Sequence, residues 1–343
     1  MGNRNDKSRR KSGAVDTEKP HAADKKTAEW SSYERKVETI GKRDFALIAK
    51  EWRAHIPSSQ VAATPPETLL HNISSIEGRI QSVPKTGSLQ EIFDAGRSIV
   101  LHEGIYLLNK AVHIQNDVAD AISKGRHTVA YINGYQGALF ALSAILALLG
   151  ISHARAPKGG AGVILIDIWP EEGLLKKPSI SSAYDQTFKL VRFQGLEHYQ
   201  KWAVLKRALR QTKFSKAYFD SLREALDNVN DLKHAYHRNQ VNYISNVWLS
   251  DDLIVDVPNG PFTAAASFQD HYDAIFENQV NSTVYSLVAL VEVGCAMLSE
   301  IGTIDPESSS PKLLPFIATE LAILNRRLAY KPILCNENWD RLP

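Results

Sequence analysis

The stretch HTVAYINGYQGALFALSAILALLGIS, residues 127–152, decides the fold, because no Lys, Arg, Asp or Glu occurs between Arg126 and Arg155. Its continuously apolar part, Gly137 to Leu149, has 13 residues, whereas a helix that crosses a bilayer needs about 20. A helix that is apolar on all sides is typical of the centre of a bundle. We therefore expect residues 127–150 to form a buried helix of a soluble protein, with Gly150 as its C-cap. A membrane-associated helix over 129–151 is the alternative.

The composition is that of a globular chain. It has 343 residues, of which 44% are hydrophobic and 23% are charged, enough for one large domain or two smaller ones. Two cysteines are too few for a disulfide framework, and the start, MGNRNDKSRRKSG, has no apolar core for a signal peptide. We therefore expect a cytoplasmic protein with no membrane contact.

The formal net charge of +2 hides an asymmetry along the chain. Residues 1–26 hold eight Lys or Arg and four Asp or Glu, so residues 27–343 carry a formal charge of −2. Because a nucleic-acid platform is usually basic, the net charge does not indicate one in the body of the protein.

Hydrophobic periodicity and helix-breaking residues divide the chain into four parts. We expect a disordered basic tail (1–29), a helical extension (30–85), a helical bundle with short strands (86–250) and C-terminal helices packing on that bundle (251–343). The fold class is mainly α, with a small β decoration around 163–193. Six helices are expected besides 127–150: 30–60, a helix from Ser88 to Ile122, 196–212, 215–248, 268–301 and 313–330. Strands are expected at 163–169, 188–193 and 253–257.

Two of these expectations rest on local signals. Ser88 and Glu91 have the spacing of a capping box, which predicts a helix N-terminus. The runs VILIDIW (163–169) and FKLVRF (188–193) are rich in β-branched and aromatic residues and have strand length, so they are expected to pair in a hairpin or small sheet.

Helix 215–248 carries the most informative polar pattern. A polar stripe at three- and four-residue spacing borders its apolar seam: Asp227, Asp231, His234, Arg238, Asn242 and Ser245. An Arg at such a rim can hold phosphate oxygens with two hydrogen bonds, and His234 and Tyr243 could transfer protons. The alternative is a solvated flank in which Asp231 and Arg238 offset each other's charge. His234 and His237 form an HxxH pair, but no second cluster has matching ligand spacing, so no metal and no cofactor are expected.

Two segments resemble the HEPN superfamily, a group of helical-bundle proteins of toxin–antitoxin, antiviral-defence and RNA-processing systems. One is AYINGYQGALFALSAILALLGI, which resembles the family's helix of aromatic and small residues. The other is HRNQVNY, residues 237–243, which resembles its late-helix Arg/polar/His motif. The resemblance covers roughly residues 90–250. It implies a dimer that cleaves RNA without a metal, through attack of a ribose 2′-hydroxyl on the adjoining phosphate.

Carried over by position, the resemblance implies that Arg238 stabilises the negative charge of the phosphate and that Asn239 is the polar residue of the motif next to it. Tyr243 stands where the nucleases have His, and Tyr, with a pKa near 10, is a poor general base at neutral pH. Some branches of the superfamily that end the motif in Tyr are not nucleases, so binding without cleavage is equally compatible with the motif.

Two functions follow. The first is a HEPN-like RNA- or nucleotide-binding homodimer of a toxin–antitoxin or phage-defence system. If it is a metal-independent ribonuclease, we expect Arg238, Tyr243 and His234 in catalysis and Asn239, Asn242 and Asp231 in substrate binding. The second is a non-catalytic helical scaffold whose helices 268–301 and 313–330 dock a partner protein.

Overall fold

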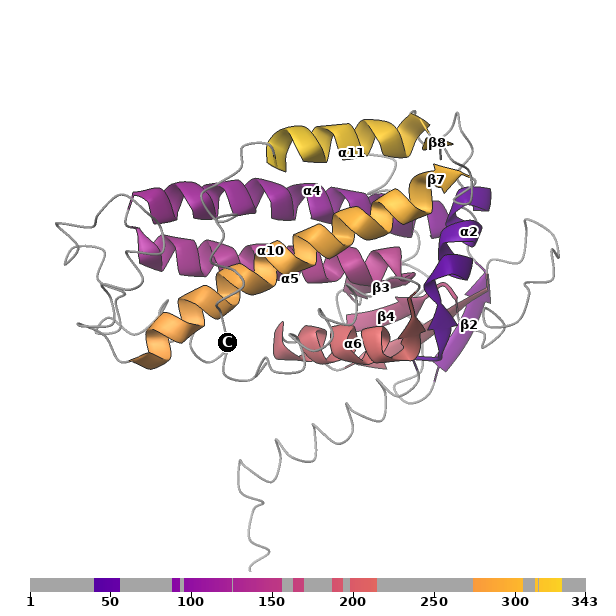
Figure 1. The fold of residues 1–343 in the computed structure, drawn as a ribbon. Coiled ribbons are helices and arrows are strands. Elements are labelled where there is room, and N and C mark those ends of the chain that lie inside the picture. The colour runs from indigo at the N-terminus through magenta and orange to yellow at the C-terminus, as the bar shows by residue number, and fades with distance from the viewer. Residues whose placement is uncertain are drawn as a thin grey trace, which may run out of the picture. The chain divides into compact units, whose positions relative to one another are not determined.

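The computed structural model describes a mainly helical protein (Figure 1). All described residues belong to one compact unit, Val37–Pro343. They are residues 40–55, 88–92, 96–124, 126–155, 163–169, 187–193, 198–214, 274–304, 312–313 and 315–328. Within these ranges the helices are α2 (Phe45–His55), α4 (Gly96–Ser123), α5 (His127–Leu148), α6 (His198–Gln211), α10 (Ala274–Gly302) and α11 (Pro315–Leu328). The predicted helical class is thereby confirmed.

Helix α5 is the central helix, as the sequence predicts. It packs against α4, α10 and α6, and Figure 1 shows it running alongside α4 while α10 crosses it. From Ala144 to Leu149 every residue is at most 1% exposed. The segment Thr128–Leu148 has the length and hydropathy of a membrane span, but 67% of its most apolar window is buried inside the structure. That burial is consistent with the core helix of a soluble protein.

Glycine makes this packing close. A Cβ on Gly137 would lie 2.9 Å from Ile114 of α4 and 3.0 Å from Leu287 of α10, closer than a side chain is normally accommodated. The small-residue face of α5 therefore packs closely against α4 and α10 at Gly137. The predicted helix 215–248 lies outside the described residues.

The end of α5 differs by one position from the prediction: Leu149 is the C-cap, and Gly150 follows it in the left-handed conformation of a glycine cap. Gly150 has a φ of +81°, a left-handed conformation that only glycine adopts without strain. Its N–H donates to the carbonyl of Ala147 at 2.8 Å, as in common glycine caps. A Cβ here would come within 2.1 Å of Trp169, so both the backbone and the space require glycine.

Two side chains from the N-terminal region bind the last carbonyls of α5. The Trp52 indole N–H donates to the Leu148 carbonyl at 2.8 Å, and the Arg43 guanidinium donates to the Leu149 carbonyl at 3.0 Å. Arg43 also pairs with Asp167 at 2.7 Å, with side chains only 1% and 4% exposed. The other Asp167 oxygen accepts from the Trp169 N–H at 3.0 Å. This group, which we call the α5 clasp (Arg43, Trp52, Asp167), satisfies carbonyls that a helix end leaves free.

Three strands that follow α5 and one that precedes α4 form a four-stranded antiparallel sheet, in the order β2-β5-β4-β3. Its strands are β2 (Ser88–Ile92), β3 (Ile151–Arg155), β4 (Val163–Asp167) and β5 (Thr187–Phe193). The predicted pairing of 163–169 with 188–193 is confirmed, with Leu165 opposite Val191. The predicted decoration thus includes β2 and β3, which the sequence interpretation missed. Leu190 and Val191 are both buried, so both faces of β5 are covered.

The capping-box prediction at Ser88 and Glu91 is wrong. These residues lie in β2, which pairs with β5 so that Ser88 is opposite Val191 and Glu91 opposite Phe188. The helix begins only at Gly96. Cross-strand pairing with a distant segment overrides a local helix-start signal, which is a weak preference.

The N-terminal helix is also shorter than predicted. Within the expected range 30–60, the structure describes α2 only from Phe45, because Arg43–Asp44 forms strand β1, which pairs in parallel with β6 (Thr212–Lys213). The Asp44 carboxylate accepts from the Ala46 N–H at 3.0 Å and so acts as the N-cap.

The C-terminal helices agree with the prediction within a few residues. In α10, Leu287, Leu290, Val291 and Leu298 are fully buried, and the helix packs on α5, α4, α2 and α11. Helix α11 contacts α4 and α10, where Asn109 donates to Glu320 at 3.3 Å. A two-stranded ribbon of β7 (Thr303–Ile304) and β8 (Lys312–Leu313) connects the two helices. The third predicted strand, 253–257, lies outside the described residues.

Candidate functional site

All six residues that the sequence singles out for a site lie outside the described part of the chain: Arg238, Tyr243, His234, Asn239, Asn242 and Asp231. The polar stripe, its solvated-flank alternative and the HxxH pair therefore stay predictions. The candidate site below is built from described residues.

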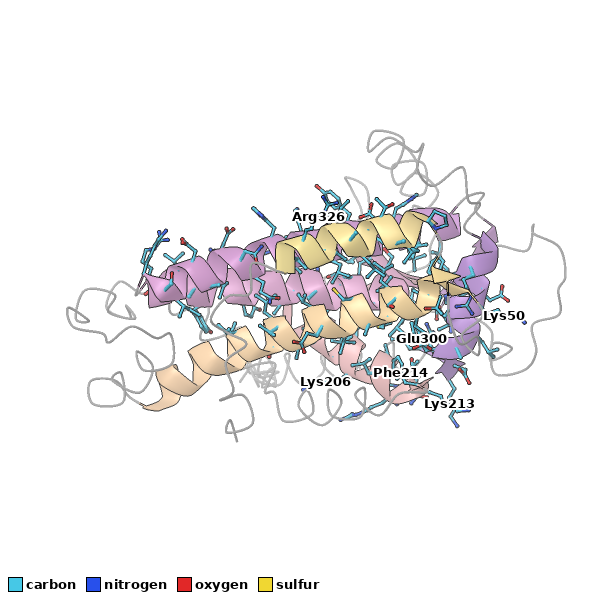
Figure 2. All side chains as sticks on the ribbon, turned by 45° about the horizontal axis from the view of Figure 1, so that its top comes forward. Lys50, Lys206, Lys213, Phe214, Glu300 and Arg326 are labelled. Atoms are coloured by element: carbon cyan, nitrogen blue, oxygen red, sulfur yellow. The ribbon has the colours of Figure 1, made fainter. Side chains whose placement is uncertain are left out.

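Helix α6 and the strand after it are strongly cationic. Residues 198–214 contain five Lys or Arg and no Asp or Glu. Trp202, Leu205, Ala208 and Leu209 are buried and hold the helix on the core. At 100° per residue, Arg210 lies on the side of the helix away from these buried residues, and Lys206 lies on the flank between them and Arg210. Both Arg210 and Lys213 are exposed. Figure 2 shows Lys206 and Lys213 on this part of the molecule.

The cationic side continues onto the ribbon of β1 and β6. Parallel pairing places Asp44 beside Lys213 and the buried Arg43 beside the buried Thr212. Lys42, two residues before Asp44, is exposed and by strand alternation lies on the same face as Asp44. Lys213 and Asp44 form an ion pair at 3.6 Å in which the lysine side chain is 77% exposed. An ion pair this exposed is a weak constraint on the lysine.

We call this surface the α6 track and define it as Lys206, Arg210, Lys213 and Lys42. Arg207 is not included because its Nε atom is buried. The track offers positive charge along a helix and an adjoining ribbon, which suits a ligand with repeated negative charge.

A second polar group lies on the inner side of α6. Ser152 of β3 donates to a carboxylate oxygen of Glu103 of α4 at 2.5 Å. Burial raises the pKa of Glu103, while the hydrogen bond from Ser152 and the positive charge of Lys201 partly oppose the rise. Burial, with Lys201 adding to the effect, lowers the pKa of His153 to about 3. His153 is therefore a neutral imidazole at pH 7, and its buried Nε2 makes no hydrogen bond to the protein.

This cluster is suited to position α6. The positive charge of Lys201 acts on both Glu103 and His153, so this residue of α6 lies near them. A histidine with a pKa near 3 is too weakly basic to take up a proton at neutral pH. We therefore assign the cluster a structural role.

The start of α6 is tied to α5. The His198 ring Nδ1 and the Tyr135 hydroxyl lie 3.2 Å apart, and their rings lie 5.7 Å apart at an interplanar angle of 32°. Tyr135 is buried. This contact fixes the first turn of α6 on the core, so the track has a rigid base.

The described residues offer little for nucleophilic or metal chemistry. Burial, reinforced by the charge of Glu292, raises the pKa of the Cys295 thiol to about 12, so it is not a thiolate at neutral pH. Among the described residues, no group of three or more His, Cys, Asp or Glu side chains is placed to hold a metal ion.

Sequence reasoning missed the α6 track. It used the net charge of a long segment, in which acidic residues elsewhere cancel the local excess of Lys and Arg. A signal was present: residues 198–214 have no acidic residue among five basic ones.

Comparison of the chain with protein-family models, with curated proteins and with solved structures found no match.

Proposed function

We propose that this protein binds RNA, with a HEPN-like helical bundle as its scaffold and the cytoplasm as its site of action. The observation that carries the proposal is the local charge of residues 198–214, five Lys or Arg without an acidic residue. Because the phosphate backbone supplies most of the attraction in non-specific nucleic-acid binding, a cationic surface on a rigid helix is suited to this ligand. The motif around Arg238 adds a second, independent reason.

The catalytic part of the proposal concerns Arg238 and Tyr243. In the resembling family, cleavage would need Arg238 near the phosphate and a base at the position of Tyr243. A tyrosine is nearly always protonated at pH 7, so it cannot act as an efficient base. We propose binding as the main activity, with metal-independent cleavage as an accessory one in a dimer of toxin–antitoxin or phage-defence type.

The docking alternative has less support from the described helices. It requires α10 and α11 to offer apolar faces to a partner protein. The apolar face of α10 is already used inside the molecule, since Leu287, Val291 and Leu298 are fully buried. The described exposed positions of α11 are Pro315, Thr319, Ala322 and Arg326, and none of them is a large hydrophobic residue.

The test measures binding of a fluorescently labelled 20-nucleotide RNA by anisotropy at 0.05 M salt. Wild-type protein is expected to bind with a dissociation constant in the range of about 10⁻⁴ to 10⁻⁶ M or tighter. Arg238→Ala is compared for binding and, with gel analysis, for cleavage in EDTA. The matched control is Arg326→Ala, which removes one exposed positive charge from α11. Wild-type protein that leaves the RNA free at 100 μM would disprove the proposal.

A further inference from the structure

We propose that the α6 track (Lys206, Arg210, Lys213, Lys42) is a binding surface for a nucleic-acid backbone, and that it reads neither base sequence nor the sugar. The inference rests on the proposed function and adds the place of contact and the specificity. It assigns the contact to described residues of α6 and the β1–β6 ribbon.

The placement of the charges indicates a linear ligand. Lys206 and Arg210 are four residues apart, so they are separated by about 6 Å along the axis of α6 and project from one side. Lys213 follows in β6 beyond the end of that helix, and Lys42 directly precedes β1, the strand that pairs with β6. The cations thus follow one another along the surface, as phosphates do along a strand.

The chemistry of the track indicates recognition of the backbone alone. Specific recognition of single-stranded RNA generally stacks bases on aromatic side chains. Within the part of the chain that the structure describes, the exposed large hydrophobic side chains are Tyr106 and Val129, on α4 and α5. Phe214, at the end of the track, packs against Phe45 at 5.5 Å between ring centroids. Lysine and arginine contacts to phosphate carry no sequence information.

Asp44 lies beside Lys213 of the track, and it makes the inference sharply testable. One oxygen caps α2 and the other pairs with Lys213. Asn caps a helix as well as Asp does. Asp44→Asn therefore keeps the cap and removes the negative charge beside Lys213. If the track binds a polyanion, this variant binds more tightly, a gain that misfolding cannot produce.

The magnitudes follow from counterion release. Each phosphate contact contributes about 0.7 to 0.9 to the slope of log K against log salt, which is about 5- to 8-fold in affinity at 0.1 M salt. Lys206→Ala/Arg210→Ala is expected to weaken binding about 25- to 60-fold there and to reduce the slope by about 1.4 to 1.8. Asp44→Asn is expected to strengthen binding by about fivefold, the value of one contact. Arg326→Ala is expected to bind like the wild type.

The probes are 20-nucleotide oligouridylate, oligocytidylate and oligothymidylate, with uridine monophosphate as competitor. The three oligomers are expected to bind within about threefold of one another because the backbone contact is sequence-independent, and the mononucleotide is expected not to displace them. Tyr199, seven residues before Lys206 in the sequence, is changed to Ala to test for stacking. Unchanged binding is expected.

Each contrary outcome has a distinct meaning. Oligomer binding that the α6 variants leave unchanged would overturn this inference and leave the proposed function standing at another surface. A preference above about tenfold for one oligomer, or a loss of that size in Tyr199→Ala, would overturn the backbone-only reading. Binding of vesicles containing phosphatidylserine, without binding of any oligomer, would identify a membrane surface and overturn both proposals.

Discussion

The buried ion pair of Arg43 and Asp167 gives the sharpest test of the fold. Arg43→Met leaves the Asp167 carboxylate, whose side chain is 4% exposed, without its counter-charge, and it removes a donor to the Leu149 carbonyl. Removing one partner of a buried pair typically costs about 3 to 5 kcal/mol, because an uncompensated charge stays in the interior. Asp167→Asn leaves Arg43 in the corresponding position and is expected to cost a similar amount.

The double variant Arg43→Met/Asp167→Asn distinguishes the interaction energy of the ion pair from the effect of each side chain on its other neighbours. Additive effects would amount to about 6 to 10 kcal/mol, but a change that removes both charges is expected to cost less than about 4 kcal/mol. The assay is equilibrium unfolding in urea, followed by tryptophan fluorescence, since Trp52 and Trp169 lie edge to face at 5.3 Å near the pair. The fit requires a two-state transition, which coincidence with far-UV circular dichroism checks.

A matched control has nearly the same geometry in solvent. Lys124 and Asp120 also approach to 2.7 Å, but their side chains are 59% and 44% exposed. Lys124→Met is expected to cost less than about 1 kcal/mol. The reasoning would be refuted if Arg43→Met cost no more than Lys124→Met, or if the double variant cost the sum of the two single ones.

Three further predictions concern α5 and its surroundings. Gly150→Ala is expected to lose more than about 2 kcal/mol of stability and part of the near-ultraviolet circular dichroism, because a left-handed alanine is strained and its Cβ would meet Trp169. Trp52→Phe, which removes the donor to the Leu148 carbonyl, is expected to cost about 1 to 3 kcal/mol in urea unfolding. Glu103 has a folded-state pKa above 4.5 because of burial, so the folded state binds the proton more tightly and stability falls as pH rises from 4.5 through that raised pKa. Glu103→Gln is expected to remove this fall in melts recorded across pH, and parallel curves for the two proteins would contradict it.

The central helix could be predicted because its signal is local and long. A run of 28 residues without Lys, Arg, Asp or Glu, with a glycine near its end, is compatible with few structures other than a buried helix. The structure confirms the buried helix and the glycine at its end. The strands β4 and β5 were also predictable, since their composition is that of strands and they pair with each other.

The errors fall where a distant segment decides the local structure. In isolation, residues 88–92 have the pattern of a helix start. They form a strand because they pair with β5, which follows about 100 residues later. Strand β3 is short and follows Gly150 directly, so the apolar run hides it. Neither case could be resolved from periodicity alone.

The candidate site shows a different limit. A helical wheel placed Arg238 at the rim of a helix, but the described structure does not include that helix. The α6 track depends on where the buried residues of α6 and the partner of β1 lie. The charges of the track are visible in the sequence. Its position beside α2 is not, because it depends on the parallel pairing of Asp44 with Lys213.

The α5 clasp has a consequence for synthesis of the chain on the ribosome. The hydrogen-bond partner of Trp52, Leu148, is synthesised 96 residues later, and the partner of Arg43, Asp167, is synthesised 124 residues later. At about 5 to 20 residues per second, these groups stay without their partners for roughly 5 to 25 seconds after they are made. During that interval Arg43 and Trp52, which are buried in the folded protein, lack their partners. A nascent chain shorter than about 170 residues is therefore the form most exposed to aggregation and to chaperones.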